Sequence, residues 1–240
     1  MPVPPLPIKS IEEQHLTIGG YLQQRANAGE ISILEAGCGR KWNFDLRPAK
    51  YTITGVDTDT SALNYRQHSE KDLDSVILGD LREVDFPAGS YDIIYNAFVL
   101  EHIFGAEKVL LKFKKWLKPG GLLILYIPDP KSAYGFLANL TPHWFHVLFY
   151  RYILGQKNAG KPGFAPYSTV YDEVVSREGI CRFAKENNLR ICEEFGFYRP
   201  TGIANLLIDL VQVLSFGRLK SSHCNLVYVL EKPPAAAIST

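Results

Sequence analysis

Glycines and acidic side chains at the ends of short apolar runs are the groups in this sequence that could bind a nucleotide-like ligand. The first three runs are followed by Gly37-Cys38-Gly39, by Asp57-Thr58 and by Gly79-Asp80-Leu81. Glycines directly after a strand let the backbone turn sharply and let a ligand approach the main chain. A carboxylate about 20 residues further along can accept hydrogen bonds from ribose hydroxyls. This order of residues predicts a site for a ligand that contains a sugar and a base.

The charge beside the glycines indicates which kind of nucleotide ligand is expected. Sites for dinucleotides usually show G-x-G-x-x-G, with the pyrophosphate at a helix N-terminus. Here Trp42 replaces the third glycine, and Glu35 precedes the first. A carboxylate suits a cation better than a pyrophosphate, which favours S-adenosylmethionine, a molecule with a sulfonium and an ammonium group. A nicotinamide-dependent dehydrogenase is therefore the weaker alternative.

Each predicted contact follows its own apolar run. We expect Asp57 to bind the ribose, Asp80 the adenine amino group, and the backbone N–H of Leu81 the adenine ring. Asn96 ends the fourth run, where the methionine part would lie. The full set of predicted cofactor-binding residues is Glu35, Gly37, Cys38, Gly39, Asp57, Thr58, Asp80, Leu81, Asn96 and Ala97. Taken singly, the glycines could serve only a turn and the aspartates only as helix caps. Their order, one group after each run, favours a ligand site.

Histidines are the residues that could assist methyl transfer. The acceptor atom must lie in line with the breaking bond, so positioning supplies much of the rate, and an oxygen acceptor also loses a proton to a base. The candidates are His102, just past the fourth apolar run, and His143 and His146, in the region that would cap the site. His102 could equally serve packing, and the other two, which share a helix face, could cap the site or bind the acceptor. No metal site is expected, because carboxylates are lacking near that pair.

Alternating strands and helices must position these groups. Apolar runs and helical periodicity predict strands over 31–36, 51–56, 75–78, 91–95 and 122–127 and helices over 10–28, 61–70 and 106–117. This α/β alternation is typical of a mostly parallel sheet with helices on both faces, which places ligands at the carboxyl ends of the strands. Beyond Asp129 we expect an aromatic-rich, irregular region over 131–170. The remaining predicted elements are helices over 142–154 and 176–188 and strands over 189–198 and 225–230.

As a series, these motifs resemble those of the Rossmann-like, class I S-adenosylmethionine-dependent methyltransferases. The series consists of Leu34-Glu35-Ala36-Gly37-Cys38-Gly39, Gly55-Val56-Asp57, Gly79-Asp80-Leu81, Tyr91-Asp92-Ile93-Ile94, Val99-Leu100-Glu101-His102 and Leu117-Lys118-Pro119-Gly120-Gly121. The resemblance covers about residues 30–130 and is greatest to small-molecule methyltransferases of the ubiquinone-pathway type. It implies a seven-stranded sheet with an antiparallel last strand, and it assigns Glu35 and the glycines to the methionine part of the cofactor. The loop departs from the family in Arg40, Lys41 and Trp42, which could cover the site or contact an acidic substrate.

The whole chain, 1–240, is expected to form one methyltransferase domain with three parts. Residues 30–130 would form the cofactor-binding core, 131–188 a cap or acceptor region, and 189–232 the last strands with an apolar helical insertion over 203–216. That insertion is too short and too polar to span a bilayer. An interfacial membrane helix, a homodimer face and burial against the sheet are the explanations left open. The expected acceptor is a small or lipid-linked molecule methylated on oxygen, nitrogen or carbon, and the alternative is a non-catalytic binding or scaffold protein of the same fold.

Composition and charge narrow the class of protein. Of the 240 residues 46% are hydrophobic, as in folded globular proteins, and a net charge of +1 gives no basic surface for nucleic acid. There are four cysteines, Cys38, Cys181, Cys192 and Cys224, and their spacing is that of neither a metal site nor a C-x-x-C pair. This indicates reduced thiols in a cytoplasmic protein. The protein would be membrane-associated if the insertion is interfacial. The N-terminus lacks the pattern of a signal peptide and is expected to be a mobile arm. The tail over 233–240 is expected to be disordered.

Overall fold

The computed structural model describes residues 4–152, 155–161, 164, 166–170, 172–197 and 202–234. Within the described elements, side chains are described except at 138, 139 and 202–207. Some predictions fall outside the described residues. These are the first three residues of the N-terminal arm, the last two of the helix over 142–154, position 198 of the strand over 189–198, and the tail beyond 234.

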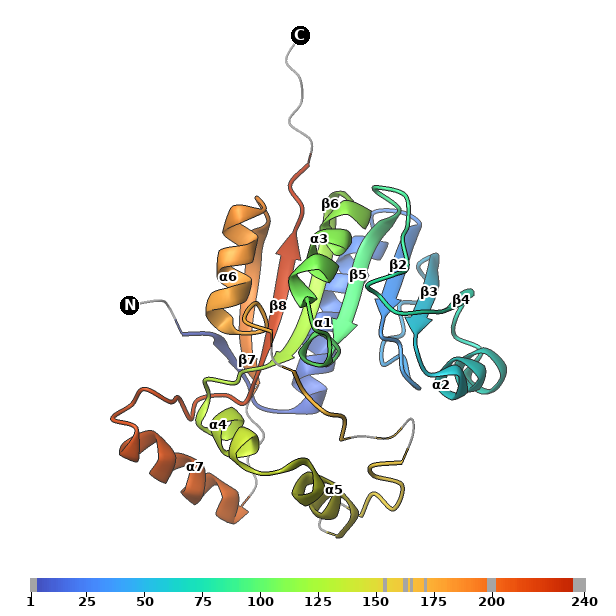
Figure 1. The fold of residues 1–240 in the computed structure, drawn as a ribbon. Coiled ribbons are helices and arrows are strands. Elements are labelled where there is room, and N and C mark those ends of the chain that lie inside the picture. Colours follow the sequence, from blue (N-terminus) through green and yellow to red (C-terminus); the bar gives the residue numbers. More distant parts are fainter. Residues whose placement is uncertain are drawn as a thin grey trace.

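Eight strands form one sheet whose carboxyl edge carries the predicted site. They are β1 (Leu6–Ile8), β2 (Ile31–Ala36), β3 (Tyr51–Asp57), β4 (Ser75–Leu78), β5 (Tyr91–Ala97), β6 (Leu117–Pro128), β7 (Arg190–Phe197) and β8 (Asn225–Glu231). Their order across the sheet is β1-β7-β8-β6-β5-β2-β3-β4 (Figure 1). β8 runs antiparallel to β6 and β7, and the other neighbouring pairs are parallel. The predicted Rossmann-like, mostly parallel α/β sheet with an antiparallel last strand is confirmed.

The predicted count of seven strands is wrong, because β1 adds an eighth. It pairs in parallel with β7, Leu6 opposite Phe195 and Ile8 opposite Phe197, and Ile8 is buried. Proline cannot donate a hydrogen bond to a sheet, so Pro7 argues against a strand in a sheet interior. At the outer edge of the sheet that missing donor costs nothing, and the proline-rich N-terminus can therefore still pair.

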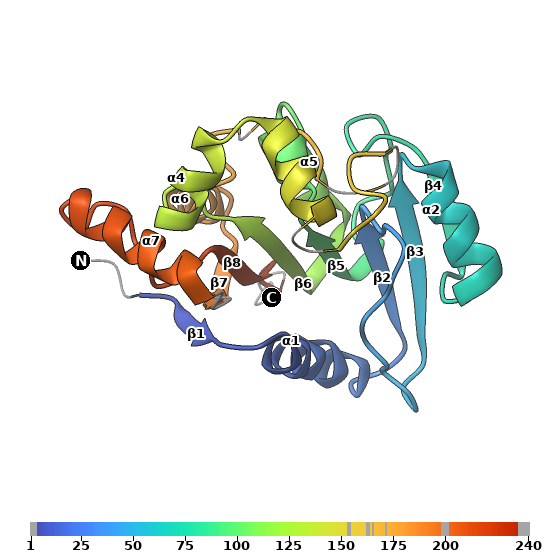
Figure 2. The ribbon, with the colours of Figure 1, turned by 90° about the horizontal axis from the view of Figure 1, so that it is seen from below.

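Helices cover both faces of the sheet and its carboxyl edge. They are α1 (Ile11–Ala26), α2 (Thr60–Tyr65) with the π-helical turn η1 (Arg66–Glu70), the 3-10 turn η2 (Leu100–His102), α3 (Ala106–Trp116), α4 (Ala133–Leu140), α5 (His143–Tyr152), α6 (Arg177–Glu186) and α7 (Gly202–Leu214). α1 lies on one face of the sheet and α6 on the other (Figure 2). α4, α5 and α7 lie beyond the carboxyl ends of the parallel strands (Figure 1).

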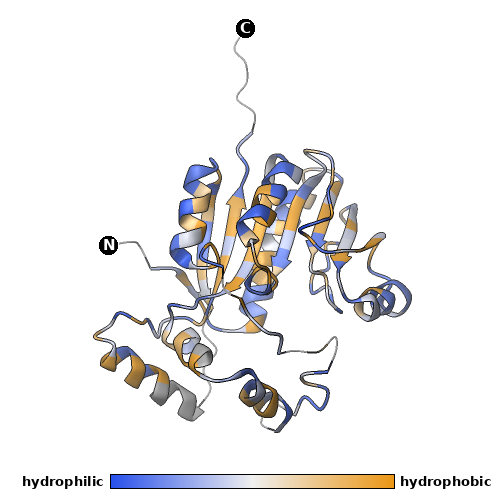
Figure 3. Cartoon of the chain, in the orientation of Figure 1, coloured by the Kyte–Doolittle hydropathy of each residue, from blue (hydrophilic) through white to orange (hydrophobic). Residues whose placement is uncertain are grey.

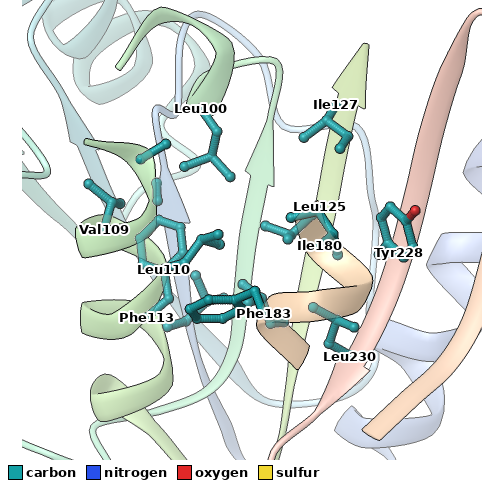
Figure 4. Packing of buried hydrophobic residues seen from close by; sticks show 14 of the residues in the cluster. Leu100, Val109, Leu110, Phe113, Leu125, Ile127, Ile180, Phe183, Tyr228 and Leu230 are labelled. Atoms are coloured by element: carbon teal, nitrogen blue, oxygen red, sulfur yellow. The ribbon is translucent and has the colours of Figure 1, made fainter. Parts of the chain in front are cut away.

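Two apolar layers hold the helices to the sheet. On one face, Phe113 of α3 and Phe183 of α6 pack against Leu125 of the sheet within a cluster of fully buried side chains (Figure 4). On the other face, Ile18 and Leu22 of α1 pack on a second cluster of strand residues. Burial of each such side chain stabilises the fold by about 1.5–3 kcal/mol. The parallel strands between the layers are buried on both sides, which explains their continuous apolar runs.

The region between β6 and α6 is more regular than predicted, because it contains α4 as well as α5. Ser132 begins α4: its Oγ accepts a hydrogen bond from the N–H of Gly135 at 2.9 Å and donates one to the carbonyl of Asp129 at 2.7 Å. A Cβ at Gly135 would lie 2.2 Å from that carbonyl, so the helix can start this close to β6 only with glycine there. Across the described residues, no helix is both long and apolar enough to cross a membrane.

Candidate functional site

The glycine turn after β2 is fixed by the neighbouring strand and by close packing. The N–H groups of Gly37 and Cys38 both donate to the carbonyl of Val56 in β3, at 2.8 and 3.1 Å. Gly37 has φ +77°, and a Cβ there would lie 2.2 Å from a methyl carbon of Val99. Both observations require glycine. The turn therefore exposes main chain rather than side chains at the carboxyl edge of the sheet.

Asp57 joins this turn to the loop after β3. Its Oδ2 accepts the N–H of Gly39 at 2.8 Å, and its Oδ1 accepts the N–H of Asp59 at 2.9 Å. Asp59 in turn caps α2 by accepting the N–H of Ser61 at 2.8 Å. Each carboxylate oxygen of Asp57 keeps a further lone pair, so this side chain can order the loops and still accept a hydroxyl of a ligand. Thr58 is exposed between the two aspartates.

Arg66 is a buried residue of this site that the sequence analysis missed. Its guanidinium donates to Glu35 Oε2 at 2.8 Å, to Asp72 Oδ1 at 2.6 Å and to the carbonyl of Cys38 at 2.8 Å. Burial raises the pKa of the Glu35 carboxyl to about 7, and the guanidinium beside it opposes that rise. The Glu35 carboxylate is therefore paired with a cation inside the protein. The glycine motif alone does not reveal this pair.

Two of the three atypical residues after Gly39, Arg40 and Trp42, have structural partners. The Arg40 guanidinium lies over the rings of Tyr65 and Phe164, 5.7 and 5.1 Å from their centroids, and donates to Ser61 Oγ. It thereby links the glycine loop to the segment that follows α5. Lys41 is exposed.

Trp42 takes a different direction from Arg40. Its ring meets those of Phe44 and Tyr95 edge to face, at 5.1 and 5.5 Å between centroids. This arrangement of aromatic pairs is favourable beyond simple burial. The bulky residue at the third-glycine position therefore packs toward β5.

The loop after β4 is held from outside by α3. Asp80 pairs with Arg82, which lowers the pKa of its carboxyl, and Leu81 is buried in the core. The ammonium group of Lys112 donates to the carbonyls of Val84 at 2.8 Å and of Arg82. These bonds from one lysine of α3 to two carbonyls of the loop hold the backbone that is predicted to face the adenine.

The end of β5 carries an unpaired polar atom and a strained backbone. Asn96 is fully buried, its Nδ2 donates to the carbonyl of Ala36 at 2.7 Å, and its Oδ1 has no partner among the described residues. Ala97 is partly exposed beside it. Phe98 follows with φ +56°, a conformation that is rare for a bulky residue, and its ring is 43% exposed. Strain of this kind concentrates at binding sites.

Glu101 and His102 form a largely buried pair on η2. His102 Nε2 lies 3.8 Å from Glu101 Oε1, and Glu101 Oε2 has no partner among the residues described. Burial raises the pKa of the Glu101 carboxyl to about 7 and lowers the pKa of His102. His102 Nδ1 lies 2.7 Å from the carbonyl of Ser168, which can only accept, so Nδ1 carries the hydrogen and Nε2 the lone pair.

The segment over 166–170 closes over this pair. The ring of Tyr167 lies 5.7 Å from that of His102, and the N–H of Val170 donates to the carbonyl of Glu101 at 2.8 Å. Burial raises the pKa of the Tyr167 hydroxyl, and the charges of Asp59 and Asp57 raise it further. Tyr167 therefore lies between the residues after β3 and those after β5.

The other two predicted histidines lie on α5, outside this cluster. His143 is exposed at the start of α5, and His146 Nε2 lies 2.7 Å from Thr141 Oγ1.

A buried pair that the sequence analysis missed lies after β6, where His223 Nε2 is 2.8 Å from Asp129 Oδ2. A surface groove of about 590 Å³ between α1 and the loop at Asn43, Phe44 and Asp45 is lined by none of the predicted site residues.

Comparisons with known proteins identify a methyltransferase domain in this chain. Residues 34–125 match the family model described as a methyltransferase domain. A thiol S-methyltransferase of Rattus norvegicus is 27% identical over 134 residues, which are 51% of this chain and 54% of that protein. A protein of Mycolicibacterium smegmatis named as a probable S-adenosylmethionine-dependent methyltransferase is 28% identical over 98 residues, 40% of this chain and 38% of its own. The chain spans about half the length, or less, of these curated relatives.

Solved structures share the fold at low identity. The geranyl diphosphate C-methyltransferase of Streptomyces coelicolor, solved with Mg²⁺, geranyl diphosphate and S-adenosyl-L-homocysteine, has a TM-score of 0.55 and 14% identity. The match covers 92% of this chain and 82% of that one. At this identity the likeness shows the fold alone.

Proposed function

This chain belongs to the class I methyltransferase family, and we propose that it transfers the methyl group of S-adenosylmethionine to a small-molecule acceptor. The observation that carries the proposal is the buried Oδ1 of Asn96, which has no partner among the described residues beside the glycine turn. A buried acceptor without a donor costs about 1–3 kcal/mol. The ammonium group of S-adenosylmethionine would supply such a donor.

The cofactor would be held by the residues that end β2, β3, β4 and β5. Glu35, Gly37, Cys38, Gly39, Asn96 and Ala97 are assigned to its methionine part, Asp57 and Thr58 to the ribose, and Asp80 and Leu81 to the adenine. S-adenosylmethionine supplies a methyl group on a positively charged sulfur when it is bound. The free lone pairs of Asp57 and the exposed main chain of the glycine turn support this assignment.

His102 is the proposed base. Because its Nδ1 donates to the carbonyl of Ser168, its Nε2 can take a proton from an acceptor atom. Burial lowers the pKa of His102, so the neutral, basic form is present at neutral pH. Glu101 Oε1 lies 3.8 Å from Nε2, and its carboxylate, when ionised, would attract the protonated ring. His143 and His146 remain candidates for acceptor binding on α5.

The acceptor we propose is a small apolar molecule with one ionisable atom. Phe98 presents its ring at the ends of β5 and β6, and the exposed rings of α5 lie in the predicted cap over 131–188. The thiol S-methyltransferases among the relatives make a thiol the first acceptor to test, ahead of oxygen, nitrogen or carbon. A lipid-linked acceptor fits the same apolar surroundings, and the ubiquinone-pathway branch stays a prediction.

Isothermal titration with S-adenosylhomocysteine tests the cofactor assignment. Asp57→Ala should weaken binding at least tenfold, because it removes a ligand acceptor and releases the turn at Gly39. His143→Ala, on exposed α5, should change the affinity less than twofold. Equal effects of the two substitutions, or no binding by the wild-type chain, would contradict the assignment.

Single-turnover transfer from labelled cofactor to an alkanethiol, whose sulfur is protonated at pH 7, tests the base. His102→Gln should lower the rate constant at pH 7 by about 10²-fold while leaving cofactor affinity unchanged. The loss should shrink at a pH where the thiol is ionised without help. A rate equal to that of the wild type would rule out His102 as base. Tight cofactor binding without transfer to thiol, hydroxyl or amine probes would favour the scaffold alternative.

A further inference from the structure

α5 is an amphipathic helix whose large apolar side faces away from the protein. Its exposed side chains recur at helical spacing and comprise Trp144, Phe145, Leu148, Phe149 and Tyr152. None of the residues of α5 is fully buried. The opposite side packs on the helix's own following loop, where Val147 lies against Gly160. Arg151, at the border of the apolar side, donates to the carbonyl of Ala159 at 2.8 Å. Surface helices normally bury their apolar side, so α5 is oriented as if another apolar phase covered it.

α7 repeats this arrangement in a segment far away in the sequence. Ile208 is buried, whereas Leu210, Val213 and Leu214 are 51–71% exposed on one side of the helix. Phe216 follows directly and is 94% exposed. α7 contacts α4, whose last residue Leu140 is also exposed. Apolar residues recur along both α5 and α7, and both helices lie at the same end of the molecule (Figure 3).

The charges around these helices are mostly positive. Residues 133–161 contain Arg151, Lys157 and Lys161 and no Asp or Glu, although the whole chain has 26 basic and 25 acidic residues. After α7 come Arg218 and Lys220, both exposed. Asp209 is the only acidic residue over 202–220. An apolar surface bordered by aromatic and basic side chains is typical of proteins that lie on anionic membranes.

We propose that this surface docks the protein on an anionic lipid bilayer. The docking face consists of Leu140, Trp144, Phe145, Leu148, Phe149, Tyr152, Leu210, Val213, Leu214 and Phe216, bordered by Arg151, Lys157, Lys161, Arg218 and Lys220. A two-fold dimer through the same face would bring identical cations together, which opposes association. Anionic headgroups neutralise those cations while the acyl region covers the apolar side chains.

The docking face gives the candidate site access to molecules dissolved in a membrane. α4, α5 and α7 lie beyond the carboxyl ends of the strands, where the predicted site lies (Figure 1). If the proposed methyl transfer is correct, an apolar acceptor can reach the site from the bilayer without crossing water. This last step rests on the proposed function, whereas the docking itself does not.

Vesicle co-sedimentation without cofactor tests the docking separately from catalysis. The full chain should bind vesicles that contain 30% phosphatidylglycerol and should bind pure phosphatidylcholine at least tenfold more weakly. Leu148→Ser combined with Leu214→Ser should lower binding at least tenfold. Lys157→Glu and Arg218→Glu should each lower binding about fivefold. Leu111→Ser, an exposed apolar position on α3, is the matched control and should bind like the wild type.

Three outcomes would overturn the proposal. One is a folded wild-type chain that does not sediment with anionic vesicles. Another is equal loss of binding in the Leu111→Ser control and in the double variant. The third is a dimer in analytical ultracentrifugation that the double variant abolishes while vesicle binding is absent, which would make the face an interface between two copies. Failure of methyl transfer with vesicle binding intact would overturn the proposed function alone.

Discussion

The loops after β2 and β3 and the helices α5 and α7 lie at the same edge of the sheet but are built in opposite ways. In the loops, polar side chains are engaged inside the protein: Asp57 accepts two N–H groups, and Arg66 reaches Glu35, Asp72 and a carbonyl. In the helices, large apolar side chains such as Trp144 point away from the protein. In the first region most of the polar side chains named here have partners within the protein, whereas the apolar side chains of the second lack a covering surface.

This difference separates two tasks of the proposed enzyme. A cofactor of constant shape is bound best by groups that the protein already holds in place, because little conformational entropy is then lost when they are positioned for the reaction. An acceptor supplied from outside needs a region that can be entered. The difference predicts that substitutions in the loops change the free energy of unfolding strongly, whereas substitutions on α5 change it little.

Arg66→Met should have the largest effect. It leaves the Glu35 carboxylate buried without its cation, and we expect the free energy of unfolding to fall by about 3–5 kcal/mol in urea titration. Glu35→Gln in the same chain should restore part of that loss, because no buried charge is then left unpaired. A loss below about 1 kcal/mol would show that the pair does not hold the loop. The same conclusion would follow if the double variant lost as much unfolding free energy as the two single variants together.

The sequence predicts the loops better than the contacts that fix them. Gly37, Asp57 and Asn96 each end a strand, so local pattern and the rule for parallel sheets were enough to place them on one edge. Arg66 meets Glu35 across 31 positions, and His223 meets Asp129 across 94. Such pairs depend on how the elements pack, and neither has a local signal in the sequence.

The helices show a second limit of prediction from sequence. The sequence predicted a helix over 142–154, and α5 is present over His143–Tyr152. Periodicity identifies an apolar side but not whether the protein or its surroundings cover that side. α4 was missed because its start depends on the close approach of Gly135 to Asp129, and β1 because Pro7 argues against a strand except at an edge.

Glu101→Gln should have the next largest effect, visible as a pH dependence. Burial raises the pKa of Glu101 to about 7 in the folded chain, whereas the unfolded carboxyl titrates near its usual value of 4.5. Between these values the folded state binds more protons, so the wild type should lose stability as pH rises from about 4.5 to 7, by up to about 3 kcal/mol. In urea titrations, the unfolding free energy should fall less between pH 5 and pH 7.5 for Glu101→Gln than for the wild type.

The control for this measurement is Glu186→Gln, at an exposed position on α6. It should keep the pH slope of the wild type, because exposure leaves its carboxylate solvated in both states. Glu35 contributes to the same pH range in every variant, and its part therefore cancels in the comparison. Identical slopes for Glu101→Gln and the wild type would show that the Glu101 carboxyl is solvated or paired in solution.

The smallest effect is expected on α5, where Leu148→Ala should change the free energy of unfolding by no more than about 0.5 kcal/mol. The matched substitution Leu110→Ala on α3 removes the same atoms from a fully buried position and should cost about 2–5 kcal/mol. The large difference between two identical substitutions follows from exposure alone, because Leu148 is 42% exposed and packs on no buried layer of its helix. A cost for Leu148→Ala close to that for Leu110→Ala would mean that α5 is covered by the protein itself in solution. The contrast between a closed cofactor edge and an open acceptor side would then be lost.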